Sequence, residues 1–335
     1  MTDTGKREVT RSDVAKHARV STAVVSYVVN NGPRPVAKAT RERVLASMET
    51  LGYRPNAAAR ALRLQRATAV GLVVPDVSNT YFGALAQAVS NRAFDAGYAL
   101  LLGDSDNDID REAAQIDSLV GRQVDGLIVV SLDPSTTMAV GRTPTVYLDR
   151  RAAADQAVIL PDNYGGAQMA VEHLLQHGRK RIGHLAGPEG GPGADERLKG
   201  WEDTVRSAGQ TEALSFVERA EFTRNGGYEA GRRLLKNPDR APDALFVSSD
   251  VQALGLLRAA REANVRVPED LAVISFDGTE DAAYSDPPLS AIEQPIEEIA
   301  AAALAAVLAD PFIPVHERVG VSLVTRASCG CHSYA

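Results

Sequence analysis

Polar side chains that could bind a ligand follow several short apolar segments of the chain. In chain order these residues are Asp76, Ser78, Asp149, Ser249, Asp250 and Asp277. In open α/β sheets, ligands bind beyond the carboxyl ends of the strands, where such side chains meet. Carboxylates accept hydrogen bonds and hydroxyls both donate and accept them, so the pattern favours a site for a polar ligand. Each residue also has a structural alternative, such as the capping of a following turn by Asp277.

Histidine and cysteine residues predict little metal chemistry. His173 and His177 are four residues apart on a predicted helix, but the HExxH pattern is absent, and we favour a surface pair over a metal site. Cys329 and Cys331 are the only cysteines, too few for a disulfide framework or a complete zinc site. With help from His332 they could bind a soft metal, but such a pair is usually inert. We therefore predict no metal and no cofactor.

Enzymatic motifs are also missing from the sequence. The Gly-rich stretch at 187–193 lacks the Lys-Ser/Thr of a phosphate loop, and we interpret it as a mobile loop. No nucleophile elbow, dinucleotide fingerprint or Ser/His pair is present, so we predict no catalytic residue and no enzyme activity.

The elements that must position the polar side chains are short strands separated by helical stretches. The predicted strands are residues 69–75, 98–103, 126–131, 145–149, 181–187, 244–249 and 271–276. Strands that are apolar on both faces and separated by helices indicate doubly wound parallel sheets. At 335 residues the chain exceeds the roughly 250–300 residues at which single cores divide, and two such sheets fit this length.

The charges are distributed unevenly along the chain. Residues 1–66 carry three Lys and ten Arg against five acidic residues, a net charge of +8, whereas the remainder carries -15. A basic head and an acidic body predict that only the head contacts a polyanion. The longest uncharged apolar run, 299–309, falls short of the about 20 residues that span a bilayer, and the amino terminus does not resemble a secretory signal. We expect a cytoplasmic protein.

The head has the pattern of a helix-turn-helix. A short helix within 9–18 begins near Ser12, and Ser21 is a suitable N-cap for a second helix over 22–30. A third helix is predicted over 38–51, with Val44, Leu45, Met48 and Leu51 at core spacing. The second helix should bury Val24, Val25, Val28 and Val29. Its open face, which would enter the major groove, then carries Thr22, Ala23, Ser26 and Tyr27.

These residues carry a resemblance to a known family. VTRSDVAKHARVSTAVVSYVVNN and VAKATRERVLASMETLGYRPNAAARALR resemble the head of the lactose-repressor (LacI/GalR) family of bacterial transcription regulators. ISFDGTED at 274–281, PPLS at 287–290 and Gln294 resemble the family's late strand and crossover. The resemblance implies two lobes of periplasmic-binding-protein type. It places their crossovers near Leu160–Asp162, Ser290–Gln294 and Val321–Val324.

Four positions depart from the family pattern. Arg19 stands where the turn usually has Gly, at a cost of roughly 1 kcal/mol if the backbone there is left-handed. Ala37 replaces a Ser cap, and Ser249 replaces a frequent Asn, which leaves the ligand's identity open. Tyr27 stands where many relatives place Arg, and it lacks the fork that binds guanine O6 and N7. The family's half-site therefore does not transfer to this chain.

Residues 53–68 are predicted to form a linker with a hinge helix. Asn56 can cap an Ala-rich segment that is too short to be stable alone, so this segment should order only against DNA and a partner linker. The resemblance implies that the hinge lies in the minor groove and that Leu62 wedges between base pairs. Packing of Leu62 on the body is the alternative. The predicted DNA-binding residues are Ser21, Thr22, Ala23, Ser26, Tyr27, Arg54, Asn56, Ala59, Leu62 and Arg63.

For the body, the resemblance adds Arg197 and Phe222 to the strand-end residues. Carboxylates, an Arg fork and an aromatic plane suit a polyhydroxylated ligand. The predicted effector-binding residues are Asp76, Ser78, Tyr81, Asp149, Arg197, Phe222, Ser249, Asp250 and Asp277.

The sequence thus predicts a three-helix α head with a hinge helix, followed by two doubly wound α/β lobes. The predicted domains are 1–52, 53–68 and 69–335, the last with an N-lobe (about 69–160 and 293–322) and a C-lobe (about 161–290 and 323–333). We predict a homodimeric repressor that binds a near-palindromic double-stranded operator and responds to a sugar or glycoside. The alternatives are a corepressor-dependent regulator that binds a nucleobase, a nucleoside or a partner protein, and a solute-binding protein without DNA activity.

Overall fold

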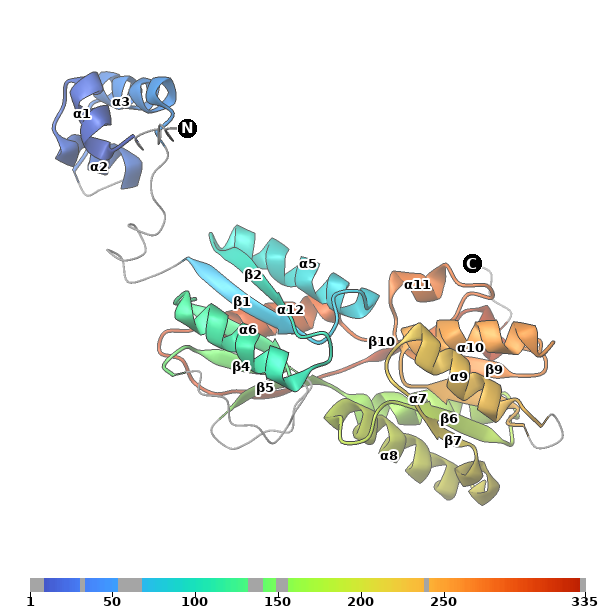
Figure 1. Cartoon of the computed structure of the whole chain (residues 1–335). Coiled ribbons are helices and arrows are strands. Elements are labelled where there is room, and N and C mark those ends of the chain that lie inside the picture. Colours follow the sequence, from blue (N-terminus) through green and yellow to red (C-terminus); the bar gives the residue numbers. More distant parts are fainter. Residues whose placement is uncertain are drawn as a thin grey trace, which may run out of the picture. The chain divides into compact units, whose positions relative to one another are not determined.

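A computed structural model describes residues 9–30, 34–53, 68–131, 141–148, 156–237 and 241–331. The chain divides into two compact units, Met1–Ala67 and Thr68–Ala335. The second unit contains two six-stranded sheets with their helices (Figure 1).

The first unit is a bundle of three helices, α1 (Arg11–Ala18), α2 (Thr22–Asn30) and α3 (Lys38–Leu51). Helix α1 begins with a capping box, in which the Asp13 backbone N–H donates to Thr10 Oγ1 and the Thr10 backbone N–H donates to Asp13 Oδ2. The turn to α2 passes through Arg19 in the left-handed conformation, with φ of 55°. The α2 and α3 boundaries confirm the predicted helices.

The core of the bundle is smaller than predicted, because Val24, Val29, Met48 and Leu51 are only half-buried. Val14, Val25, Val28 and Val44 are buried, whereas Leu45 is 46% exposed. Ser47, two residues further along α3, is buried and donates a hydrogen bond to the Arg43 carbonyl. The predicted burial of Leu45 was wrong because the inner face of α3 has the spacing of residues 44, 47, 48 and 51, and residue 45 lies beside that face.

The first lobe of the second unit is a parallel sheet in the order β11-β5-β4-β3-β1-β2. Its strands are β1 (Ala69–Val74), β2 (Ala99–Asp104), β3 (Gly126–Val130), β4 (Thr145–Leu148), β5 (Ala157–Pro161) and β11 (His316–Val319). Helices α5 (Thr80–Asp95), α6 (Ile109–Gly121) and α12 (Ile296–Val307) cover it. The core lies between the apolar strands and the Ala-rich faces of α5 and α12.

The second lobe has the sheet order β12-β10-β9-β8-β6-β7, which is parallel except for the β10–β12 pair. Its strands are β6 (Ile182–Ala186), β7 (Val217–Arg219), β8 (Ala244–Val247), β9 (Ala272–Asp277), β10 (Ser290–Glu293) and β12 (Ser322–Val324). Its α-helices are α7 (Asn163–Gln176), α8 (Pro192–Ser207), α9 (Arg224–Leu234), α10 (Asp250–Glu262) and α11 (Glu280–Ala283). The 3-10 helices are η1 (Thr211–Ser215) and η3 (Ala327–Cys329).

The two predicted parallel sheets are confirmed. One core of the second lobe lies under α7 and α8, around Trp201, and another lies under α9 and α10. The chain passes between the lobes after β5, after β10 and between β11 and β12 (Figure 1). The carboxyl ends of strands from both sheets therefore meet at one cleft.

No helix in the described part of the chain has both the length and the apolar character that crossing a membrane requires.

Candidate functional site

A cavity of about 520 Å³ lies between the two lobes. From the first lobe it is lined by residues that follow or end strands β1, β3, β4 and β5, such as Asp76 and Ser131. From the second lobe it receives Arg197 of α8, Ser249 before α10 and Asp277 at the end of β9. This volume falls within the range of cavities that hold small molecules.

Arg197 is a cation that lines this cavity, and protein contacts fix its guanidinium. It is only 5% exposed, and its Nε donates to Oδ1 of Asn163 at 2.8 Å while Nη1 donates to the Ser248 carbonyl at 2.5 Å. Its Cζ lies 3.7 Å from the centre of the Phe276 ring, a cation–π contact. Because the fork is positioned before any ligand arrives, little side-chain entropy is lost when it binds one.

Asp277 is the buried carboxylate next to this guanidinium. Its Oδ1 lies 3.8 Å from Arg197 Nη1 and accepts a hydrogen bond from Gln294 Nε2 at 2.8 Å. Burial raises the pKa of Asp277 to about 8; Arg197 opposes this shift and the nearby Asp250 carboxylate adds to it. The backbone φ of Asp277 is 111°, a conformation rare for a residue with a side chain. Such strain is found where the surrounding structure fixes a functional side chain.

Asp250 has a different position from the one predicted. It is fully buried and does not line the cavity. Its carboxylate accepts hydrogen bonds from the hydroxyl of Ser275 at 2.5 Å, and from the backbone N–H and hydroxyl of Thr279 at 2.6 and 2.7 Å. Burial raises its pKa, and the three donors oppose that shift. Asp250 therefore joins α10 to β9 and its following turn beneath the cavity.

An aromatic side of the cavity is formed by Phe222, which precedes the N-cap of α9. The ring packs so closely on Gly187 that a Cβ at that position would lie 2.3 Å from Phe222 Cζ. The Phe222 ring can occupy this position only because residue 187, directly after β6, is a glycine. Phe82 and Ile159 add apolar surface from the first lobe. A ligand with both polar groups and a C–H or ring face fits such a lining.

The structure brings most of the predicted effector residues together. Those that line the cavity are Asp76, Tyr81, Arg197, Phe222, Ser249 and Asp277. Ser78 is exposed and does not line it; its backbone N–H donates to Asp76 Oδ1 at 2.8 Å. Asp149 lies outside the described residues.

Several polar residues of the lining were missed by the sequence interpretation. They are Asn79, Asn107, Ser131, Glu189, Glu221, Thr223 and Gln294. Asn79 had a recognisable signal, because it follows a strand and caps α5 by accepting from the Tyr81 N–H at 3.1 Å. The sequence signal for Gln294 was weaker: it is a polar residue directly after β10, where the chain crosses to the first lobe.

The head presents its predicted surface on α2. Thr22 and Ala23 are exposed, and Ser26 and Tyr27 are half-buried. Ser21 Oγ accepts the Val24 N–H at 3.3 Å, as an N-cap does. The other predicted DNA-binding residues lie outside the described residues: Arg54, Asn56, Ala59, Leu62 and Arg63.

A helix-turn-helix followed in the chain by two doubly wound lobes with a cavity between them defines a class of ligand-responsive DNA-binding regulators. Comparison with known proteins agrees with this class. The family model described as bacterial regulatory proteins, lacI family, matches residues 10–56, and that of the periplasmic binding protein-like domain matches residues 171–329. The chain belongs to the LacI family of transcriptional regulators.

Several relatives are similar over most of the chain. A ribose operon repressor of Halalkalibacterium halodurans is 36% identical over 290 residues, 86% of each chain. Catabolite control protein A of Priestia megaterium is 34% identical over 88% of this chain and 90% of its own. The transcriptional repressor PurR of Escherichia coli is 35% identical over 87% of this chain and 86% of its own.

Solved structures of known regulators share the fold of this chain. The lac repressor dimer bound to operator and the anti-inducer ONPF superimposes with a TM-score of 0.85 and 28% identity, covering 96% of this chain and 99% of that one. The complex of the regulator CelR with cellobiose has a TM-score of 0.69 and 28% identity, covering 96% of this chain and all of the other.

Proposed function

We propose that this protein is a homodimeric repressor whose affinity for a near-palindromic operator changes when a sugar or glycoside binds between its lobes. The observation that carries the effector class is that the buried pair Arg197 and Asp277 and the aromatic ring of Phe222 line one cavity. The Arg197 guanidinium and the Asp277 carboxyl can form hydrogen bonds with hydroxyl groups, and the ring packs on the C–H face of the sugar. The bound cellobiose of the CelR structure supports this class.

A nucleobase or nucleoside is the second candidate. It is favoured by the flat Phe222 ring, on which a base would stack, and by similarity to PurR. A base would engage Asp277 and Gln294 through ring N–H groups and carbonyls, whereas a sugar would engage them through hydroxyls.

The DNA-binding role is assigned to α2 and the hinge segment. Two copies of the chain would place two short α2 helices in successive major grooves and two Leu62 side chains at the operator centre. Leu62→Ala should then weaken operator binding by a few kcal/mol and reduce DNA bending, while non-specific, salt-dependent binding through residues such as Arg54 and Arg63 persists. An unchanged bend and operator affinity would refute the wedge.

The remaining assignments follow from this role. We propose a regulator without enzyme activity that works in the cytoplasm, with a head at 1–52, a hinge at 53–68 and an effector domain at 69–335. A solute-binding protein would not need the basic head. Light scattering of the free protein and of its operator complex tests the dimer, and a monomer in both would refute it.

The effector is identified by a thermal-shift screen of the full chain against sugars, nucleosides and sugar phosphates. A ligand present at 100 times its dissociation constant adds about 2.7 kcal/mol to the free energy of unfolding. Operator affinity is then measured with and without the ligand found. Coupling of 1–3 kcal/mol corresponds to a change of roughly 5- to 150-fold.

Variants separate the cavity from the head. Arg197→Ala should lose the ligand response and retain operator binding without ligand, because Arg197 belongs to the second unit and is not among the predicted DNA-binding residues. Arg258→Ala is the matched control, since Arg258 lies on the exposed side of α10, paired with Glu262 at 3.0 Å. A full response in Arg197→Ala would show that the effector binds elsewhere. A response to a nucleoside and to no sugar would select the second candidate.

A further inference from the structure

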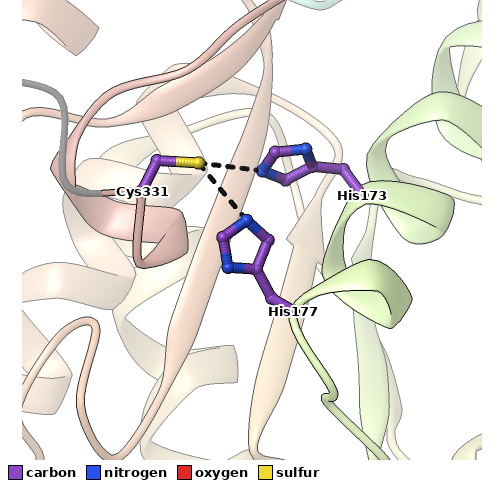
Figure 2. A group of neighbouring side chains, drawn as sticks. All are labelled: His173, His177 and Cys331. Carbon is purple, nitrogen blue, oxygen red and sulfur yellow. Dashed lines mark hydrogen bonds between the residues drawn. The ribbon is translucent and has the colours of Figure 1, made fainter.

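Three potential metal ligands meet at the edge of the second lobe, away from the effector cavity. His173 and His177 come from the last turns of α7, and Cys331 follows η3 near the end of the chain (Figure 2). The sequence interpretation treated the histidine pair and the cysteine pair as unrelated features. In the structure the nitrogen and sulfur atoms of the three residues all lie within 4.8 Å of one another.

The distances match those of a metal centre. Cys331 Sγ lies 3.4 Å from His173 Nε2 and 3.3 Å from His177 Nε2. In a tetrahedral zinc site with Zn–S of about 2.3 Å and Zn–N of about 2.0–2.1 Å, a sulfur and a nitrogen ligand are about 3.6 Å apart. The two sulfur–nitrogen distances are therefore close to those of a zinc centre, and the two imidazole nitrogens lie within 4.8 Å of each other.

The backbone explains why the three side chains converge. Residues four apart on a helix lie on the same face, and the two imidazole rings are 4.6 Å apart between centroids. On the other side, Cys329 is buried in the core and fixes η3, and Gly330 with φ of 95° turns the chain back toward α7. Cys331 is thereby directed at the pair of rings (Figure 2).

The surroundings are compatible with a bound ion. Both rings direct their Nε2 atoms at the same sulfur (Figure 2). Without metal, the Cys331 thiol can donate to one imidazole and accept an Nε2–H from the other, whereas a metal is bound by the thiolate and by two unprotonated Nε2 atoms. His173 and Cys331 are half-buried while His177 is exposed, so an ion can enter from solvent and keep a water as its fourth ligand.

We propose that His173, His177 and Cys331 form a binding site for Zn²⁺, which links the end of the chain to α7. Imidazole and thiolate together select zinc among the common divalent ions, and carboxylate ligands of the kind that Mg²⁺ or Ca²⁺ requires are not in this cluster. Binding transfers the Cys331 thiol proton to solvent and forms one Zn–S and two Zn–N bonds, with no change of oxidation state. The proposal does not depend on the effector or on DNA binding.

The test uses the full chain, purified without a histidine tag and treated with a chelator. Zinc content after incubation and dialysis should be one ion per chain, and Zn²⁺ should raise the thermal midpoint. Co²⁺ should give the visible absorption of a tetrahedral centre together with the ultraviolet band of a cobalt–thiolate bond. Mg²⁺ should produce neither effect.

Variants decide the ligands. Cys331→Ser should lose the thiolate band, and His173→Ala and His177→Ala should each lose the tetrahedral spectrum and the thermal shift. His316→Ala, at an exposed histidine in β11, and Cys329→Ala, at the neighbouring cysteine, should keep all three signals. The proposal is overturned if zinc does not bind above background, if Cys331→Ser keeps the thiolate band, or if the histidine variants bind as the native chain does.

Discussion

The hydroxyl of Tyr81 donates a hydrogen bond to Oε1 of Gln294 at 2.9 Å and so joins the first turn of α5 to the crossing after β10. The same Gln294 amide donates from Nε2 to Asp277, whose carboxylate lies beside Arg197. A continuous series of polar contacts therefore runs from the first lobe to the second along the wall of the cavity. A ligand that enters the cavity will contact groups whose positions depend on both lobes, so its binding is coupled to their relative position.

Removal of the Tyr81 hydroxyl should destabilise the second unit. In Tyr81→Phe the buried Gln294 amide loses a donor, and the free energy of unfolding should fall by about 1 kcal/mol. Urea unfolding of the full chain measures this loss. Tyr228→Phe is the control, because that hydroxyl bonds Glu262 at the protein surface and its removal should cost less. Equal losses in the two variants would show that the Tyr81 contact has no special weight.

Asp277 should make stability depend on pH. Its carboxyl has a pKa of about 8 when folded and near 4 when unfolded, so between these values only the folded protein holds the proton. Stability from this group is then present at low pH, is lost as pH rises toward about 8, and is constant above that value. Asp277→Asn is uncharged throughout and should not show this loss.

The measurement is the difference in unfolding free energy between Asp277→Asn and the native chain, from about pH 5 to about pH 9. As the pH rises to about 8, the native chain should lose stability relative to Asp277→Asn, and above that value the difference should be constant. Asp270→Asn is the control, because hydrogen bonds from Arg266 lower the pKa of Asp270 to about 2, so this carboxyl stays ionised over the whole range and the difference should be flat. A flat difference for Asp277→Asn as well would contradict the raised pKa.

Tyr27 should determine the preferred operator half-site. Tyr27→Arg introduces a fork that can bind guanine O6 and N7, and the selected half-site should gain a guanine with about 1–3 kcal/mol of discrimination. Selection from a randomised operator library identifies the preferred half-site, and affinity measurements then give the discrimination in favour of guanine. Tyr27→Phe removes only the hydroxyl and should gain no guanine. If Tyr27→Arg selects the same half-site as the native chain, residue 27 does not contact bases.

The left-handed residue Arg19 should be a source of instability in the head. Arg19→Gly relieves a conformation that costs residues with a Cβ about 1 kcal/mol, so hydrogen exchange in the three helices should slow. Gly52→Ala is the reverse substitution at the end of α3, where φ is 64°, and it should accelerate exchange. A slower exchange in both variants would show that the backbone conformation is not the cause.

The sequence by itself determined the elements. The helices at 22–30 and 38–51 and seven of the twelve described strands were predicted, because capping, apolar periodicity and burial on both faces act over a few residues. The strands that were not predicted are β5, β7, β10, β11 and β12. The sequence also determined which side chains stand at strand ends, and Arg197, Asp277 and Phe222 could be assigned to one site. The exposure of Leu45 was not predictable, because the helix pattern does not say how wide a face its neighbours cover.

Only the tertiary structure decided which of these side chains meet. Asp250 and Ser78 both follow strands, but one is turned into the core to hold Thr279 and the other is exposed to solvent. Gln294 meets Tyr81 over a separation of 213 residues, and Cys331 meets His177 over 154. Contacts of this kind depend on how sheets, crossings and helix ends pack together, and no local pattern in the chain encodes that packing.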